Sequence, residues 1–216
     1  MRRALAAEFT GALLLTAAVV GSGIMGERLA GGNAAIALLA NTGATVAALA
    51  TLIAVLGPIS GAHFNPVVTL VAFHQRQITF PRALTFIAVQ VAGCCAGAIL
   101  ANLMFELPAI HASTHTRTGA AQWLSEVVAT AGLVYIAFSS SISAAAWRVP
   151  AWIGAAYWFT ASTSFANPAI TIGRSLSDTF AGIRPADAPG FIVAQLAGGV
   201  LGALLLRLLA ERRVPA

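Results

Sequence analysis

Charged residues are scarce in this chain, and lysine is absent. Only 9% of the 216 residues are charged and 58% are hydrophobic, whereas an ordinary soluble domain is about one quarter charged. The basic residues are all arginines, and they lie at the ends of apolar segments instead of forming one patch, which argues against a nucleic-acid partner. The composition therefore predicts a protein whose main solvent is the lipid bilayer.

Cysteine is nearly absent as well. The two cysteines, Cys94 and Cys95, are adjacent inside an apolar run, so a disulfide between distant elements is excluded. We interpret both as small helix-packing residues, without a redox or metal role.

Six apolar runs are candidate membrane spans, and several reach the roughly 20 residues that a helix needs to cross the hydrocarbon layer. A removable signal peptide accounts for only one such run. The expected spans are residues 5–25, 34–56, 81–105, 123–143, 149–161 and 189–209. The fifth has a polar exit, which blurs its end.

The distribution of arginine predicts the orientation. Six spans place both termini on one side, together with most of the arginines, and an excess of positive charge marks the cytoplasmic side. That side collects Arg2, Arg3, Arg76, Arg82, Arg148, Arg207, Arg212 and Arg213, and the opposite side has Arg28, Arg117, Arg174 and Arg184. We expect a multi-pass plasma-membrane protein with cytoplasmic termini, in a bacterial inner membrane.

One three-part pattern occurs twice in the same order. The first copy is Glu8, Asn65-Pro66-Val67 and Gln90-x-x-Gly93, and the second is Glu126, Asn167-Pro168-Ala169 and Gln195-x-x-Gly198. Because each half has three spans, an odd number, the second half must run through the membrane in the opposite direction. We expect one transmembrane channel domain over residues 1–216, with a first repeat at 1–106 and an inverted second repeat at 122–216.

The two Asn-Pro dipeptides each precede a short apolar stretch, residues 66–73 and 168–176. At ~1.5 Å per residue these stretches are too short to cross the bilayer, and proline favours the first turn of a helix. They predict two half-helices whose N-termini place partial positive charge in mid-membrane, where it repels cations. Asn65 and Asn167 cap these helices and offer amide donors to a passing solute. The predicted fold is all-α: six transmembrane helices plus two re-entrant half-helices, in an inverted 3+3 repeat.

Glu8 and Glu126 are the only acids inside the expected spans. Charged groups are costly there and face the interior of the bundle. We expect each carboxylate to accept hydrogen bonds from the unwound backbone before a half-helix. A proton relay and a position at the membrane interface are the alternatives.

The segment from Ser60 to Thr69, SGAHFNPVVT, resembles the first signature loop of the aquaporin, or major intrinsic protein, family. The likeness extends to the two glutamates, the Gln-x-x-Gly segments and the second Asn-Pro-Ala. It implies a homotetramer with one pore per subunit and passive flow of water or small uncharged solutes, without catalysis or a cofactor. It also places His63 in the signature loop, where it either lines the inner pore or packs the loop.

Two departures from the family pattern concern the pore. Val67 replaces the alanine of the first motif, and Ile170 stands where members usually have a constriction arginine. Family spacing places the other constriction residues at Thr45, Ala155 and Ser164, none of which is bulky. A ring of these four residues should be wider and less polar than a water filter. Arg174, one turn beyond Ile170, either supplies charge to the outer vestibule or lies on the surface.

The runs at 167–171 and 174–182 resemble a bacterial aquaglyceroporin-like subgroup associated with arsenic resistance. Arsenous acid is neutral near neutral pH and has three hydroxyls, as glycerol does. The resemblance therefore implies a channel for arsenite, methylated arsenicals or glycerol, with some water permeation. A water-selective aquaporin is the alternative within the family.

Two further classes are disfavoured. An ion-coupled transporter also uses inverted repeats, but the spans offer almost no ligands for a driving ion. An enzyme would need an orienting acid or metal beside Ser60 and His63, the only close nucleophile and base pair. His111 and His115 could bind a metal if their segment were helical, but a solvated loop is the simpler interpretation.

Overall fold

The structure, a computed structural model, describes residues 1–209 of the chain, and within this range it contains eight helices and no strand. The helices are α1 (Arg2–Leu29), α2 (Ala34–Ser60), α3 (Pro66–His74), α4 (Phe80–Met104), α5 (Ala120–Phe138), α6 (Ile142–Phe159), α7 (Pro168–Arg174) and α8 (Ala188–Leu209). The predicted all-α class, with six long and two short helices, is confirmed. Arg212 and Arg213, which we assigned to the cytoplasmic side, lie outside the described residues.

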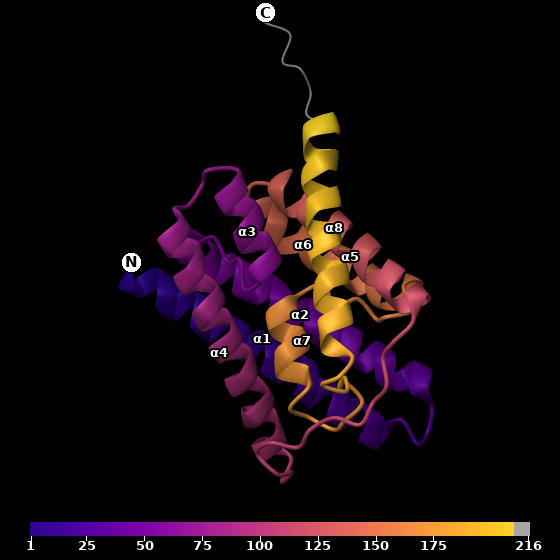
Figure 1. The fold of residues 1–216 in the computed structure, drawn as a ribbon. Helices are drawn as coiled ribbons and strands as arrows, with labels where there is room; N and C mark the ends of the chain where they lie inside the picture. Colours follow the sequence, from indigo (N-terminus) through magenta and orange to yellow (C-terminus); the bar gives the residue numbers. More distant parts are fainter. Residues whose placement is uncertain (210–216) are drawn as a thin grey trace, which may run out of the picture.

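The two halves of the chain repeat one packing scheme. α1 packs against α2 and α4, and α5 packs in the same way against α6 and α8. Each short helix contacts the last helix of both halves: α3 touches α4 and α8, and α7 touches the same two helices. Figure 1 shows α3 in the upper half of the bundle and α7 in the lower half. The inverted repeat thus brings the two half-helices together inside the bundle.

Five described helices are long and apolar enough to cross a membrane by length and composition, namely α1, α2, α4, α5 and α8. The helix α6, with 18 residues and Arg148 in its sequence, completes the six of the fold. The connection between α5 and α6 differs from our prediction. α5 ends at Phe138 instead of Ser143, and α6 begins at Ile142 instead of Val149. The serines between them explain the difference, since the Ser141 hydroxyl caps α6 by accepting from the Ala144 N–H at 3.3 Å.

The C-terminal ends of α2 and α7 also differ from the predicted ends. α2 continues through Pro58 to Ser60, beyond the expected end at Leu56. α7 ends at Arg174, two residues before the expected end at Leu176. Each shift comes at a polar or proline-containing stretch, where hydropathy alone defines an end poorly.

Glycine permits very close helix contacts, at equivalent places in the two halves. A Cβ added to Gly93 of α4 would stand 2.6 Å from the Phe9 carbonyl oxygen of α1, and one added to Gly198 of α8 would stand 2.6 Å from the Val127 carbonyl oxygen of α5. Only a residue without a side chain fits at such a distance. These two glycines therefore help to set the spacing of the first and last helix in each half, together with Gly97 and Gly202 at the same interfaces.

Candidate functional site

Each short helix begins at an asparagine that caps it. The Asn65 Oδ1 accepts from the Val67 N–H at 2.9 Å, and the Asn167 Oδ1 accepts from the Ala169 N–H, also at 2.9 Å. Proline occupies the first helical position in both cases, where no backbone donor is lost. Both helices therefore point their N-termini, with unpaired N–H groups and positive partial charge, toward the centre of the bundle.

The same two asparagines tie the halves to each other. The Asn65 Nδ2 donates to the Ala166 carbonyl oxygen at 2.7 Å, and the Asn167 Nδ2 donates to the Phe64 carbonyl oxygen at 2.8 Å. A side-chain amide has two N–H groups, and within the described residues only one of each pair has a protein acceptor. The second N–H of each amide is thus available to a molecule beside it.

The residues before the asparagines have a strained backbone. Phe64 and Ala166 both have a φ of 48°, in the left-handed region that is unfavourable for side chains other than glycine. Such a residue costs on the order of 1 kcal/mol or more and persists only when its surroundings fix it. Here the carbonyl of each residue is held by the asparagine of the other half.

Glu8 holds the backbone before α3. Its carboxylate is fully buried and accepts four hydrogen bonds, from the Ser60 hydroxyl at 2.6 Å, the His63 N–H at 3.0 Å, the Phe64 N–H at 2.8 Å and the Gln90 amide at 2.8 Å. A carboxylate with this many donors is well compensated in a buried position.

Glu126 makes the equivalent contacts before α7. It accepts from the Ser162 hydroxyl at 2.6 Å, the Phe165 N–H at 2.9 Å, the Ala166 N–H at 2.8 Å and the Gln195 amide at 2.6 Å. Neither glutamate lines the central cavity. Both carboxylates therefore serve as hydrogen-bond acceptors for the unwound loops. Because neither lines the cavity, they do not form a proton relay along it.

A cavity of about 310 Å³ runs between the two halves. Its lining includes Asn65 and Asn167, together with His63 and Gln77 of the first half and Arg174 at the end of α7. The His63 Nδ1 is 3.1 Å from the Thr69 hydroxyl, so His63 both lines the cavity and packs its loop. No carboxylate of the described residues lines the cavity.

Three of the four expected constriction residues line this cavity, and the fourth does not. Thr45, Ser164 and Ile170 are lining residues, whereas Ala155 lies on the exposed face of α6. The assignment of Ala155 was wrong because family spacing does not fix which face of α6 points inward. Two residues along a helix rotate a side chain by about 200°, so the opposite face, with Tyr157, meets the cavity.

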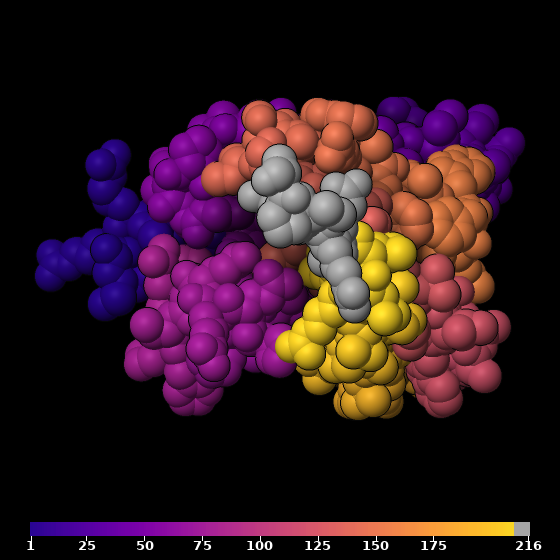
Figure 2. All heavy atoms as spheres, turned by 90° about the horizontal axis from the view of Figure 1, so that it is seen from above, coloured from indigo at the N-terminus to yellow at the C-terminus, as the bar shows by residue number. Residues whose placement is uncertain are grey.

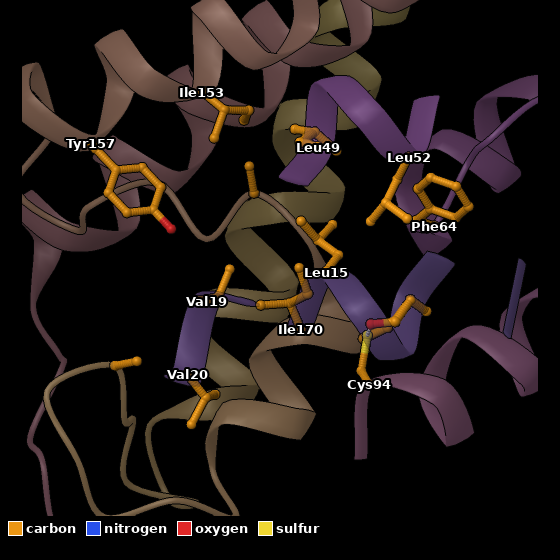
Figure 3. Close-up of a cluster of buried hydrophobic side chains, with 14 of the residues drawn as sticks. Leu15, Val19, Val20, Leu49, Leu52, Phe64, Cys94, Ile153, Tyr157 and Ile170 are labelled. Carbon is orange, nitrogen blue, oxygen red and sulfur yellow. Dashed lines mark hydrogen bonds between the residues drawn. The ribbon is translucent and has the colours of Figure 1, made fainter. Parts of the chain in front are cut away.

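Tyr157 is the bulkiest residue that the sequence analysis missed beside Thr45 in the cavity lining. Its hydroxyl is 3.3 Å from the Thr45 hydroxyl, and Figure 3 shows the hydroxyl pointing toward the space beside Val19 and Ile170. Leu15 and Ile170 lie together on the apolar side of that space. We expected a constriction without bulky residues, and the position of Tyr157 beside Thr45 shows that this expectation is wrong.

Arg174 lies on the cavity wall. Its exposed fraction is 2%, and its Nε donates to the Ala181 carbonyl oxygen. The guanidinium carbon stands 3.3 Å from the centroid of the Phe165 ring. Of the two alternatives left open by the sequence, the surface position is excluded and a position beside the cavity is found.

The segment with His111 and His115 is an extended strap over the α7 end of the molecule. It is not helical, and both histidines are exposed. Asp178 binds the strap, since its carboxylate accepts from the Thr114 N–H at 2.8 Å, a bond that lowers the pKa of that carboxyl. No cluster of three or more potential metal ligands occurs in residues 1–209.

The comparisons with known proteins agree with this geometry. The family model of the major intrinsic proteins matches residues 1–161 and 141–215. The chain is 50% identical to the aquaglyceroporin AqpS of Rhizobium meliloti, an alignment that covers 100% of this chain and 93% of that protein. It is also 34% identical to the probable aquaporin TIP1-1 of Oryza sativa, over 65% of this chain and 57% of that protein.

A solved structure has the same fold. The X-ray structure of the aquaglyceroporin from Plasmodium falciparum superposes with a TM-score of 0.74 at 15% identity, over 97% of both chains. At this identity the likeness shows the fold alone. The family model and the full-length relative decide the assignment: the chain belongs to the major intrinsic protein family, whose members are multi-pass membrane channels and not enzymes.

Proposed function

We propose that this channel conducts small uncharged solutes passively, with glycerol and metalloid acids such as arsenite and methylated arsenicals as the main cargo and water as a lesser one. The observation that carries the proposal is the cavity itself. It passes both capping asparagines, it includes the apolar side chain of Ile170, and no carboxylate of the described residues lines it. A path of this kind offers hydrogen bonds to neutral molecules and nothing to bind a cation.

The Asn-Pro motifs have the central role in this proposal. Asn65 and Asn167 donate to a solute oxygen while the N-termini of α3 and α7 repel cations. Pro66 with Val67, and Pro168 with Ala169, start the two helices at the correct depth. Glu8 and Glu126 hold the loops that present the asparagines, and His63 lines the cavity beyond them.

The outer constriction determines the cargo. Thr45, Ser164 and Ile170 stay in the proposed filter, and Tyr157 takes the place first given to Ala155. Ile170 offers no hydrogen bond and suits the carbon backbone of glycerol or the methyl group of a methylated arsenical. The hydroxyls around it suit the hydroxyls of the same molecules. The full-length relative is named an aquaglyceroporin, which supports this choice of cargo.

A water-selective channel is the second candidate, and two residues favour it. Tyr157 and Arg174 both line the cavity, and a large ring together with an arginine narrows a pore and favours water. Ile170 argues the other way. The relative permeability of glycerol and water therefore distinguishes the two candidates.

The assembly and orientation belong to the same proposal. We assign both termini to the cytoplasm and the functional unit to a homotetramer in the lipid bilayer. Viewed from above (Figure 2), the magenta turn after α3 borders the yellow α8, and the Arg207 Nη2 is 2.6 Å from the His74 Nε2. Arg207 therefore shares one end of the bundle with Arg76, whereas Arg28 bonds the Phe105 carbonyl at the other end. This division supports the proposed orientation.

Stopped-flow measurements on proteoliposomes test the function. Light scattering follows the volume change after a gradient of glycerol or arsenite, and water flow is measured with an impermeant osmolyte. The proposal expects glycerol and arsenite entry well above that of empty liposomes without any sodium or proton gradient. Entry of water alone would select the water channel. Solute entry that stops when ion gradients are collapsed would instead indicate an ion-coupled transporter.

A further inference from the structure

The cavity contains a buried arginine that the proposed function does not use. Arg174 ends α7, four residues after Ile170 and seven after Asn167, so the three side chains share one face of that helix. All three line the cavity. Along this face a solute meets Arg174, then Ile170 and then Asn167.

Packing fixes the position of the Arg174 guanidinium. It lies against one aromatic ring, with 3.3 Å from Cζ to the centroid of Phe165, and its Nε donates to the Ala181 carbonyl. Arg117 approaches the same ring, with its Cζ 5.2 Å from the centroid, and its Nε donates to the Gly182 carbonyl at 2.7 Å. Cation–π contact and carbonyl acceptors thus hold both cations in place.

The charge of Arg174 has no carboxylate partner among residues 1–209. The ion pairs in this range are His111 with Asp178 and Arg184 with Asp187. Arginine stays protonated in proteins. A fixed positive charge beside a narrow cavity, with no carboxylate at contact distance, repels other cations, because the surrounding dielectric constant is low.

Hydroxyl groups line the same cavity as this charge, among them those of Thr45, Tyr157 and Ser164. The Tyr157 hydroxyl pairs with the Thr45 hydroxyl at 3.3 Å. The Ser164 side chain also lines this cavity, the residue is 2% exposed, and its hydroxyl has no hydrogen-bond partner among residues 1–209. A buried hydroxyl without a partner is costly, so the cavity must supply one, from water or solute.

We infer that Arg174 provides the fixed positive charge of the outer constriction, one helical turn outside Ile170, and that it forms with Tyr157 and Ser164 a binding station for hydroxyl-bearing neutral solutes. The inference rests on the proposed function, in which this cavity is the conducting path. It separates two tasks along α7. Arg174 excludes cations and binds hydroxyl oxygens, and Ile170 contacts the apolar part of the solute.

Conductance in planar bilayers tests the charge. We compare wild type with Arg174→Met, which keeps a chain able to pack on Phe165, and Arg174→Lys, which keeps the charge. In sodium or ammonium chloride, wild type and Arg174→Lys should carry almost no cation current. Arg174→Met should raise it at least about tenfold, which corresponds to the loss of roughly 1.4 kcal/mol of repulsion. The control is Arg184→Gln, an exposed loop arginine paired with Asp187, which should behave as wild type.

The proposed binding station of Arg174, Tyr157 and Ser164 is tested separately. This second test remains informative if the Arg174→Met protein fails to fold. Tyr157→Phe and Ser164→Ala each remove a single oxygen and should slow glycerol entry severalfold relative to water flow. An unchanged ratio of glycerol to water in both variants, or a folded Arg174→Met protein without cation current, overturns the inference. If wild type conducts no neutral solute, the proposed function fails instead. The wild-type flux thus separates the two failures.

Discussion

Ile170 is the residue at which the pore differs most from the family pattern, and its replacement tests the assigned filter. Ile170→Arg should reduce glycerol and arsenite permeability at least about tenfold, a barrier increase of roughly 1.4 kcal/mol, with a smaller effect on water. The reason is that a guanidinium at this position would fill the apolar side of the cavity beside Leu15 and Val19. Stopped-flow light scattering measures all three rates.

The matched control for this substitution is Ile170→Met. It has a comparable reach but stays neutral and apolar, so its glycerol permeability should remain within about twofold of wild type if polarity and charge decide the filter. Equal solute rates in wild type and the arginine variant, with both proteins folded, would show that Ile170 does not form the constriction.

The sequence predicted some of these side-chain positions and not others, for a physical reason. Asn65 and Asn167 follow from local chemistry, because an asparagine before a proline caps the helix that the proline starts. Tyr157 depends on the rotation of α6 about its axis, which is set by packing against α2 and α5. Arg174 depends on Phe165 and the Ala181 carbonyl, which no local pattern places beside it.

At the scale of whole helices, the contact between α1 and α4 sets the width of the first half. Gly93→Ala should destabilise the protein by about 1–3 kcal/mol, as overpacking does, because the new Cβ would stand 2.6 Å from the Phe9 carbonyl oxygen. Gly198→Ala should do the same between α5 and α8. Thermal unfolding in detergent measures the loss.

Gly43→Ala provides the control within a helix. No heavy atom lies within 4 Å of a Cβ added there. Alanine is favoured over glycine in a helix by about 1 kcal/mol, so this variant should be as stable as wild type or slightly more so. An equal loss in Gly43→Ala and Gly93→Ala would contradict the role given to close contact.

The strap over α7 depends on an ionised Asp178. Hydrogen bonding from the Thr114 N–H lowers the pKa of this carboxyl in the folded protein. Because the folded pKa is the lower one, the stabilisation is fully present above the ordinary aspartate range and is lost as the pH falls through the folded pKa. Asp178→Asn should loosen the strap at neutral pH, whereas wild type should loosen only in stronger acid.

Amide hydrogen exchange of residues 110–118 is the measurement for this prediction. Faster exchange confined to the strap in Asp178→Asn, with unchanged exchange in α1 and α5, is the expected pattern. Asp187→Asn is the comparison, since Asp187 binds the Arg117 N–H at 2.9 Å and should affect the far end of the same strap. Identical exchange in wild type and Asp178→Asn would disprove the assigned contact.

For the molecule as a whole, the division of arginines predicts how it sits in the membrane. A protease-cleavable tag before Met1 should be protected in right-side-out vesicles, and the same tag inserted after Thr116, in the exposed strap, should be cut. The cause is the retention of positively charged segments on the cytoplasmic side. Cleavage of the first tag and protection of the second would reverse the orientation.

The overall architecture was more predictable than the site. Long apolar runs predict the membrane spans, because the bilayer tolerates helices whose backbone groups are satisfied internally. The repeated Glu, Asn-Pro and Gln-x-x-Gly pattern predicts the two inverted halves. The end of α5 and the start of α6 were missed, since Ser141 acts as a cap within an apolar region. A helix cap depends on a single side chain, and the mean hydropathy of a segment does not reveal it.

The reciprocal bonds between Asn65 and Ala166, and between Asn167 and Phe64, have a consequence for biosynthesis. The acceptor for Asn65 lies 101 residues further along the chain, so it does not yet exist when the first half leaves the ribosome. Until then Glu8 and α4 of the first half already hold the loop and α3, but the Asn65 amide lacks its acceptor in the second half. The bonds that join the two capping asparagines to the opposite half can therefore form only after the second half is translated, and a chain truncated before Ala166 lacks the acceptor that ties α3 to that half.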